Sequence, residues 1–410
     1  LRQVQDALEE AHGHPLTVLN RPSDRANAKP FVVAIDGPSG MDFDSGEVDP
    51  LTLTAQLTVT FANPKQGHFR FPAAEHVGEL VVADIGIPEE IDIPAAGLEV
   101  LTPERVRGWL PSRPADAHKG TFGKALIVAG SMNYTGAAGL AATAAVRTGA
   151  GLVTLGLAGA LHNAIVPLVP EATYLILPSV LGAITGDAIQ ILEDHFEDYD
   201  ALLVGPGLGQ AEETVGFIRS LFGLTTGKRA PGFLTSEPSS NEKKNRSRRP
   251  PLILDADGLN ILSRLDDWPT LLPPGTILTP HPGEMSRLTG KSIGEIEAHR
   301  WGTAIEYAER WGQVIILKGA FTVIASPEGE AVLLPFANAG LASAGTGDVL
   351  AGAVVALRAQ GLGAFRAAAA GAFLHGLAGE LARRYQGKTG MAARDVAQSL
   401  PEALYRLTGE

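Results

Sequence analysis

Short apolar runs of the kind that form buried strands recur along most of this 410-residue chain, and helical stretches separate them. The run 124–130 precedes an alanine-rich helical stretch from about residue 136 to 148, which Gly149 is expected to end. Residues 321–326 and 330–334 are expected to add an antiparallel hairpin. Further runs lie at 152–157, 201–205, 252–255, 276–279 and 313–318. Because strands that alternate with helices form a parallel sheet covered on both faces, we predict a doubly wound, mostly parallel α/β fold.

The N-terminal part has strand-like runs of its own. They lie at 31–36, 57–61 and 79–84, and they suggest parallel strands of one sheet. A connector rich in proline, alanine and glycine follows at 91–103. We therefore predict two domains, a partial Rossmann-like α/β domain over 1–98 and a larger domain over 101–410.

Residues 225–250 interrupt the alternation of strands and helices. The segment is polar and has few apolar residues, and its end, the run 242–249, is rich in Lys and Arg. Such a segment is either a basic arm for an anionic partner or a solvated surface insertion. The low apolar content favours the insertion.

Composition excludes several classes of function. The net charge of −12 argues against a general nucleic-acid-binding protein, although anionic small molecules need only a local positive site. The absence of cysteine removes disulfides, thiolate catalysis and zinc–thiolate sites, and it agrees with a cytoplasmic location. The sequence contains no stretch of eighteen uninterrupted apolar residues, so no segment is expected to span a membrane. The chain opens at Leu1 without a methionine, so we expect a fragment of a longer protein.

The segment 338–348 carries the strongest chemical signal. Its small residues end in Gly345, Thr346, Gly347 and Asp348, and a helix pattern follows at once. A helix start offers unpaired N–H groups to an anion, and glycine lets a phosphate approach them closely. Asp348 is then placed to take a proton from a hydroxyl beside that phosphate. By itself this loop is also compatible with a plain glycine-rich turn.

Other polar loops follow predicted strands, at the sheet edge where doubly wound proteins bind ligands. The loop 205–209 lets a ligand approach the backbone, and in 279–284 two prolines fix the backbone around His281. His281 and Glu284 are either a metal pair, or a hydrogen-bonding group and a water-mediated Mg²⁺ contact. Lys318, a cation beside a glycine, could bind nucleotide phosphates. Taken alone, it would be interpreted as an ordinary surface lysine.

Two acids stand at the end of the run 252–255. We expect one of Asp255 and Asp257 to point at the site and the other to cap the following helix, with Asn260 in its first turn. A P-loop is absent, because Met285 stands where that motif needs a glycine before Gly290. A nucleotide must therefore bind in another way.

In chain order these loops resemble the ADP- or ATP-dependent NAD(P)H-hydrate dehydratases, a branch of the ribokinase-like superfamily. The resemblance covers about 101–410 and rests on the stretches 119–124, 149–153, 205–209, 255–260, 279–284, 318–322 and 344–348. Ribokinase-like sugar kinases usually have Asn-x-x-Glu where this chain has His281-Pro-Gly-Glu284, which favours the dehydratase branch. The resemblance implies a cytoplasmic lyase that repairs NADH or NADPH hydrate, in its S form, by phosphorylating the hydrate and eliminating phosphate.

The resemblance also implies roles for individual residues. Asp348 would be the catalytic base. Contacts to the hydrate would come from Ala138, Gly207, Thr279, Pro280, His281, Pro282, Gly283, Glu284 and Asp348. The nucleotide would be lined by Lys318, Gly319, Ala320, Phe321, Thr322, Asn338, Ala344, Gly345, Thr346 and Gly347. The fused arrangement looks bacterial, so ADP with Mg²⁺ is the expected donor, with ATP as the alternative, and a homo-oligomer is expected.

Residues 1–98 resemble the last part of an NAD(P)H-hydrate epimerase domain. The resemblance rests on 32–42, 62–67 and 82–86, and it implies that Asp36 contacts substrate and Ser39 helps to bind K⁺. The family's earlier Asn-Asn-Gly-Gly-Asp-Gly segment is absent. We therefore predict that this chain by itself does not epimerise the hydrate.

Two rival functions remain open. A ribokinase-like kinase for a vitamin-precursor alcohol shares the Gly-Thr-Gly-Asp loop and would leave a stable phosphoester. A non-catalytic nucleotide-binding or scaffold protein would retain the fold without turnover, and the joint presence of Asp348, Lys318 and His281 argues against it.

Overall fold

The computed structural model describes residues 31–87, 98–224 and 249–409, and it divides the chain into two compact units, 1–93 and 94–410. The expected insertion at 225–250 lies outside the described residues, except for its last two positions. Within the described ranges, no helix is long and apolar enough to cross a membrane.

The first unit contains a parallel sheet in the order β1-β2-β3. Its strands are β1 (Val33–Ile35), β2 (Leu57–Phe61) and β3 (Glu79–Ala83), accompanied by the short helices η2 (Gln66–Phe69) and α2 (Ala74–Val77). The central strand β2 is buried at both apolar and threonine positions. Thr58 satisfies its hydroxyl by donating to the Val77 carbonyl at 2.6 Å, so it can lie in the core.

The second unit is built on a ten-stranded sheet in the order β4-β15-β14-β13-β12-β11-β10-β5-β6-β7. The strands from β13 to β7 run parallel, the β14–β15 hairpin is antiparallel, and β4 pairs parallel to β15. The strand bounds are β4 (Glu99–Val100), β5 (Lys124–Val128), β6 (Leu152–Ala158), β7 (Thr173–Leu177), β10 (Ala201–Val204), β11 (Leu252–Leu254), β12 (Ile277–Leu278), β13 (Val314–Leu317), β14 (Val323–Ala325) and β15 (Ala331–Leu333). A separate ribbon pairs β8 (Ser179–Val180) with β9 (Ala183–Ile184). The predicted mostly parallel sheet and the hairpin near its end are confirmed.

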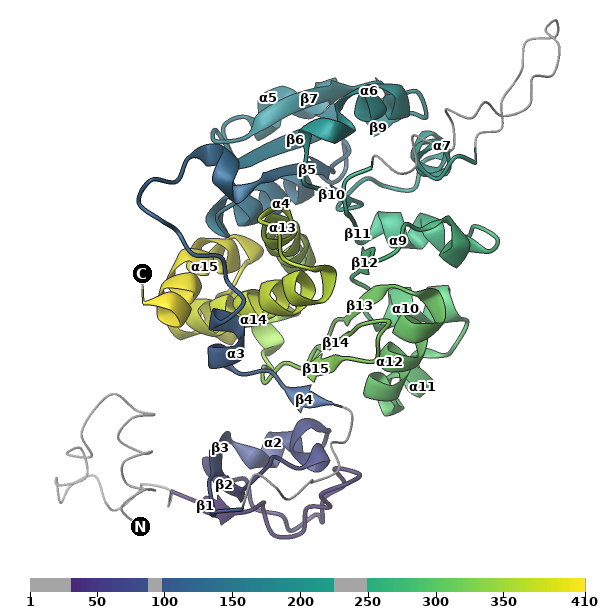
Figure 1. Cartoon of the computed structure of the whole chain (residues 1–410). Coiled ribbons are helices and arrows are strands. Elements are labelled where there is room, and N and C mark those ends of the chain that lie inside the picture. The colour runs from purple at the N-terminus through teal and green to yellow at the C-terminus, as the bar shows by residue number, and fades with distance from the viewer. Residues whose placement is uncertain (1–30, 88–97, 225–248, 410) are drawn as a thin grey trace, which may run out of the picture. The chain divides into compact units, whose positions relative to one another are not determined.

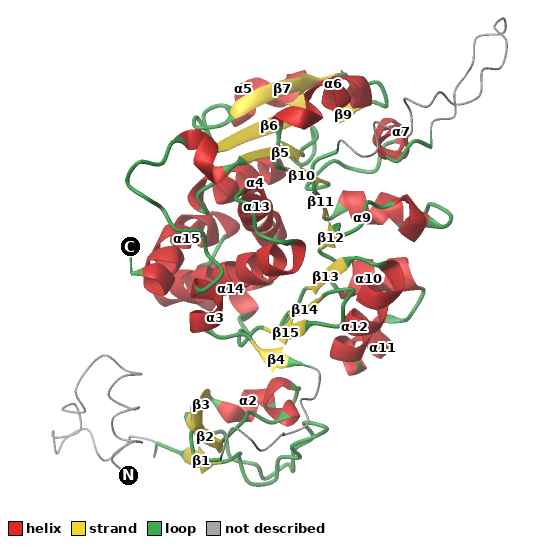
Figure 2. Cartoon of the chain, viewed as in Figure 1, coloured by secondary structure: helices red, strands yellow, loops and turns green. Residues whose placement is uncertain are grey.

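Helices cover both faces of this sheet (Figures 1 and 2). One layer holds α3 (Pro103–Arg107), α4 (Thr135–Arg147), α5 (His162–Ile165), α13 (Thr346–Ala359), α14 (Ala364–Gly390) and α15 (Ala393–Thr408). The other holds α6 (Ala188–His195), α7 (Glu212–Leu221), α9 (Asp257–Leu262), α10 (Pro282–Thr289), α11 (Ile293–Ala298) and α12 (Arg300–Trp311). The covering explains why the strands are apolar on both faces rather than alternating.

Small residues let the first layer pack closely. A methyl group built on Gly352 of α13 would lie 2.2 Å from the Ala141 carbonyl oxygen of α4, so only glycine permits this approach. Buried alanines continue the contact, among them Ala138 and Ala353. The close α4–α13 pair fixes where α13 begins, and this start lies beside the carboxyl ends of the parallel strands.

Candidate active site

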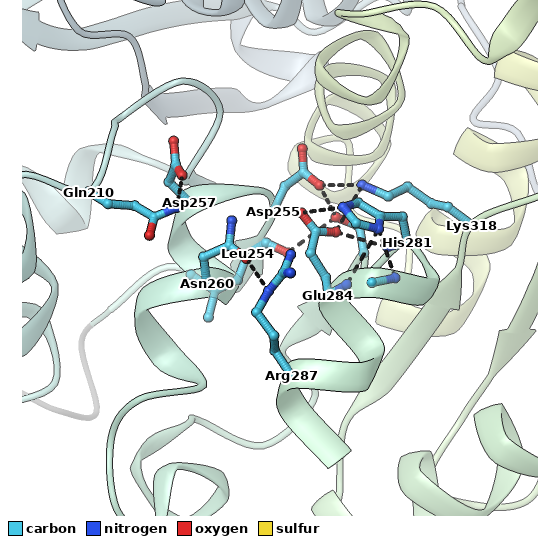
Figure 3. A network of polar contacts seen from close by, with 11 residues as sticks. Gln210, Leu254, Asp255, Asp257, Asn260, His281, Glu284, Arg287 and Lys318 are labelled. Atoms are coloured by element: carbon cyan, nitrogen blue, oxygen red, sulfur yellow. Dashed lines mark hydrogen bonds and ion pairs between the residues drawn. The ribbon is translucent and has the colours of Figure 1, made fainter. Parts of the chain in front are cut away.

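A buried lysine stands at the centre of the site. Lys318 follows β13, and its Nζ lies 2.9 Å from Asp255 Oδ1 and 3.5 Å from Glu284 Oε2 (Figure 3). The side chains of Lys318, Asp255 and Glu284 are 18%, 1% and 5% exposed. Burial disfavours the ammonium, but the two carboxylates outweigh it and raise the pKa of Lys318. Lys318 is therefore a fixed charge inside the site and not a surface lysine.

Two loops that are distant in sequence meet the loop that carries this lysine. Asp255 follows β11 and accepts a hydrogen bond from the Thr279 hydroxyl at 2.6 Å, directly after β12. The Lys318 N–H donates to the Pro280 carbonyl at 2.9 Å. Thr279 and Pro280 are both buried, so in this structure they hold Asp255 and Lys318 in place. The predicted meeting of loops at the carboxyl edge of the sheet is confirmed.

The turn between the two acids is strained. Ala256 adopts φ 48° and ψ −117°, a conformation that non-glycine residues rarely take. The turn directs Asp255 towards Lys318 and Asp257 towards the loop 205–209. There Asp257 accepts a hydrogen bond from the Gly209 N–H at 2.8 Å. The expectation that one of these two acids points at the site is met by Asp255, but the expectation that the other caps the following helix is wrong. Ala256 is at the N-cap of α9, and the Asp257 carboxylate is engaged by Gly209 and Gln210.

His281 begins α10 and is locked by its own helix. Its Nδ1 accepts from the N–H groups of Gly283 at 3.0 Å and Glu284 at 3.4 Å, while the Glu284 carboxylate accepts from the His281 N–H at 2.8 Å. Burial, followed by the charges of Lys318 and Arg287, lowers the pKa of His281 to about 4. The imidazole is therefore neutral, with its proton on Nε2, and the ring is 50% exposed.

Asp348 lies in the first turn of α13. Gly345 precedes the helix with φ 90°, and a methyl group built on Gly347 would lie 3.6 Å from Lys318 Nζ. The first intrahelical bond runs from Val349 N to Gly345 O, so the N–H groups of Gly347 and Asp348 precede it. Burial and the charge of Asp255 raise the pKa of Asp348 to about 7, against the opposing charge of Lys318. A carboxylate with this pKa is a suitable general base near neutral pH.

The predicted nucleotide loop 318–322 is shaped by an arginine that the sequence did not reveal. Arg300 of α12 donates through Nη2 to the carbonyls of Leu317 at 3.2 Å and Lys318 at 3.1 Å. Its guanidinium occupies the space beside Gly319, where a methyl group would lie 2.6 Å from Nη2. Thr322 closes the loop by donating to the Gly319 carbonyl at 2.9 Å. This loop therefore presents Lys318 from a rigid turn, which Phe321 continues at φ 52°.

Asn338 lies near the start of the second predicted nucleotide segment. Its Oδ1 accepts from the Gly340 N–H at 2.9 Å, whereas its Nδ2 is buried without a hydrogen-bond partner in the structure. A buried amide N–H without a partner is costly, so a ligand acceptor at this position would stabilise it. Ala344, in contrast, is exposed.

The predicted substrate contact Gly207 lies against the start of α4, the helix that also contains the predicted contact Ala138. A methyl group built on Gly207, which has φ 60°, would lie 2.6 Å from Ala137 Cβ and 2.9 Å from Tyr134 O. The loop therefore rests against the start of α4, where Ser131 Oγ also donates to the Gly207 carbonyl at 2.9 Å. The side chain of Ala138 is fully buried, so a ligand would reach this position through the backbone.

Asp36 in the first unit has a charged partner of its own. Lys65 Nζ donates to Asp36 Oδ1 at 2.5 Å, and the Thr60 hydroxyl donates to the same oxygen at 2.8 Å. The bond from Lys65 lowers the pKa of Asp36, although burial opposes it. Asp36 has φ 65°, and Ser39 lies exposed on the loop that follows β1.

Comparison with known proteins agrees with this geometry. The NAD(P)H-hydrate dehydratase family model matches residues 125–402, and a model of the YjeF-related protein N-terminus matches residues 3–67. Bifunctional NAD(P)H-hydrate repair enzymes from Moorella thermoacetica and Thermofilum pendens are both 38% identical, over 98% and 92% of this chain and 71% and 67% of theirs.

Solved structures agree as well. An ADP/ATP-dependent NAD(P)H-hydrate dehydratase from Bacillus subtilis, co-crystallised with ATP and Mg²⁺, is 32% identical with a TM-score of 0.60, over 76% of this chain and 100% of that one. A ribokinase-like superfamily protein from Enterococcus faecalis, 22% identical with a TM-score of 0.61 over 78% of this chain and 99% of that one, shares the fold. These findings confirm the predicted ribokinase-like fold, and they show that the chain belongs to the NAD(P)H-hydrate dehydratase family.

Proposed function

We propose that this protein removes water from the S form of NADH or NADPH hydrate, in a reaction driven by a phosphate bond of ADP or ATP. The observation that carries the proposal is the placement of Asp348, a half-buried base with a pKa raised to about 7, at a helix start beside Lys318. Base, cation and free amides together are what phosphoryl transfer to an alcohol requires. The names of the Moorella and Bacillus relatives support the choice of alcohol.

In the first step Asp348 takes the proton of the hydrate hydroxyl. The hydroxyl oxygen forms a bond to the terminal phosphorus of the nucleotide, and the bond from that phosphorus to the bridging oxygen breaks. The electron pair leaves on the departing nucleotide, as AMP when ADP is the donor. Lys318 and the N–H groups of Gly347 and Asp348 stabilise the charge on the transferring group.

In the second step the phosphorylated hydrate loses phosphate. The carbon–oxygen bond breaks with its electron pair on phosphate, the neighbouring ring carbon loses a proton to the departing phosphate, and the carbon–carbon double bond of the dihydropyridine forms. Phosphate leaves far more readily than hydroxide, so a kinase fold can carry out a dehydration. Neutral His281 is suited to donate a hydrogen bond from Nε2 to the substrate.

Mg²⁺ fits this site only together with the nucleotide. The described part of the chain has no group of three or more His, Asp or Glu side chains that could hold a metal. Mg²⁺ is commonly bound through one or two carboxylates plus substrate phosphates, and Asp255 and Glu284 are the candidate carboxylates. Bound there, it would neutralise charge on the phosphates.

The test combines purified protein, NADH hydrate, Mg²⁺ and either ADP or ATP, with the absorbance of reduced nicotinamide as the readout. A nucleotide-dependent rise supports the dehydratase and identifies the donor, which we expect to be ADP. A stable phosphoester without that rise would favour a vitamin-precursor kinase. Binding of nucleotide without any turnover would favour the non-catalytic rival.

We further propose that residues 1–410 by themselves do not epimerise the hydrate, because they contain no Asn-Asn-Gly-Gly-Asp-Gly segment like that of the epimerase family which the first unit resembles. Ser39 would then bind K⁺ only in a protein whose epimerase site is complete. NMR of the two hydrate epimers tests this, and interconversion well above the spontaneous rate would refute it.

We also expect a cytoplasmic homo-oligomer. The lack of cysteine suits a reducing compartment, and oligomers are common in the family that the sequence resembles. Sedimentation would report the assembly, and cell fractionation the location.

A further inference from the structure

An arginine that the proposed mechanism does not use lies at the rim of this site. Arg287 is exposed on α10, three residues after Glu284 and therefore on the same side of the helix. A methyl group built on Gly283 would lie 4.0 Å from Arg287 Nη1, so the guanidinium reaches back over the first turn of α10. Its charge contributes to the lowered pKa of neighbouring His281.

The guanidinium is oriented by a neighbouring helix. Arg287 Nε donates to Asn260 Oδ1 of α9 at 2.9 Å. Figure 3 shows this hydrogen bond, with Arg287 reaching from α10 towards Asn260. Nε is engaged by Asn260, and the two Nη groups of the planar guanidinium form the fork that a ligand could meet. Such a fork matches two oxygens of a phosphate group.

Burial raises the pKa of Glu284 and the charge of Arg287 opposes this rise from a distance, but Arg287 forms no direct ion pair among the described residues. Lys318 is neutralised by Asp255 and Glu284, whereas Arg287 has no carboxylate within 4.0 Å among the residues that the structure describes. An exposed arginine held in one orientation without a direct ion pair is suited to an anionic ligand. A neutral alcohol at this site would leave that charge without a function.

We propose that Arg287, oriented by Asn260, binds a phosphate of the dinucleotide part of the hydrate and selects a dinucleotide over a small neutral alcohol. The inference rests on the proposed function. Arg287 adjoins His281 on the loop expected to contact the hydrate, while the nucleotide-donor loop at 318–322 is clamped by a different arginine, Arg300. This favours the hydrate, rather than the phosphate donor, as the anion that Arg287 binds.

The test measures kcat and KM for NADH hydrate and for the hydrate of reduced nicotinamide riboside, which has the same reacting ring and no phosphate. Loss of one bidentate, charge-assisted contact should raise the KM of Arg287→Gln for NADH hydrate about 10- to 100-fold. Its kcat, its KM for the nucleotide and its KM for the riboside hydrate should change by less than about threefold. Arg287→Lys, which keeps the charge without the fork, should fall between wild type and Arg287→Gln.

Arg264 provides a matched control. Arg264 is exposed and lies two residues after the end of α9, the helix that carries Asn260. It donates to the side-chain oxygen of Gln210, as Arg287 does to that of Asn260. Arg264→Gln should leave the KM for NADH hydrate unchanged. An equal effect of both variants, no effect of Arg287→Gln, or an effect on the KM of the nucleotide alone would each overturn the inference.

Failure of the proposed function gives a different result. Wild-type protein would then not turn over NADH hydrate with either nucleotide. Calorimetric titration with NADH hydrate still tests Arg287 in that case. A Kd raised at least tenfold in Arg287→Gln supports phosphate binding, and equal values or no binding to wild type overturn it.

Discussion

Replacing Asp348 with asparagine should stabilise this protein while it abolishes turnover. The change keeps the shape of the side chain and removes a negative charge that lies in a half-buried position near Asp255. The pKa of Asp348 is raised from 3.8 to about 7, so the folded state binds a proton more tightly than the unfolded state. Between these values the native protein holds the extra proton, and wild-type stability falls as pH rises.

The size of the effect follows from the same shift. A change of about three pKa units corresponds to at most about 4 kcal/mol, and solvent around a half-buried carboxylate reduces this to about 1–2 kcal/mol. The neutral amide of the variant would avoid this penalty at every pH. The stability gained by Asp348→Asn should therefore be small near pH 4, grow towards about pH 7 and stay constant above it.

Urea unfolding of both proteins across this range measures the gain. Asp116→Asn, at an exposed position, is the matched control and should follow wild type throughout. A variant that is less stable than wild type at about pH 8, or a gain that shrinks as pH rises, would refute the reasoning. In parallel, nucleotide binding should persist, and residual turnover within about tenfold of wild type would exclude Asp348 as the base.

Three further substitutions test other parts of the site. Lys318→Met leaves the carboxylates of Asp255 and Glu284 buried without a cation, so unfolding measurements near neutral pH should show a loss of about 3 kcal/mol that lessens in acid. Ala256→Gly relieves a positive φ and should raise the free energy of unfolding by up to about 1 kcal/mol with activity retained. Ala256→Val should lower both the free energy of unfolding and the activity. A glycine variant less stable than wild type would contradict the strain argument. Gly347→Ala places a methyl group 3.6 Å from Lys318 Nζ and should raise the KM for nucleotide at least about tenfold without a change in unfolding; an unchanged KM would separate this amide from the phosphate site.

The sequence allowed the sheet and its polar edge to be predicted, because both depend on local patterns. Apolar runs mark strands, and carboxyl ends of parallel strands meet at one edge, so the convergence of the loops around Lys318 could be inferred without coordinates. The positive φ of Ala256 could not be inferred, since alanine gives no sign of it. For this reason the expectation that one of the two acids caps α9 is wrong, and Ala256 stands at the N-cap.

Contacts between segments that are distant in the sequence also could not be predicted. Arg300 lies 18 residues before Lys318 and its side chain is only 12% exposed, yet nothing in its local sequence indicates that it fixes the loop that carries the lysine. Arg287 gave one local signal, its spacing of three residues from Glu284, but its orientation depends on Asn260 of another helix. Such partners depend on how helices pack, which no local pattern reports.

The strand β4 decides where the second unit can be separated from the first. Glu99 and Val100 pair with Val332 and Leu333 of β15, and the Leu101 N–H also donates to the Leu333 carbonyl at 2.9 Å. A dehydratase unit expressed from a start beyond residue 101 would leave one edge of a fully apolar strand, β15, unpaired. Unpaired edges of this kind recruit other chains and aggregate. We therefore expect the two-residue strand to guard the edge of β15 against aggregation, so a stand-alone second unit should begin before Glu99.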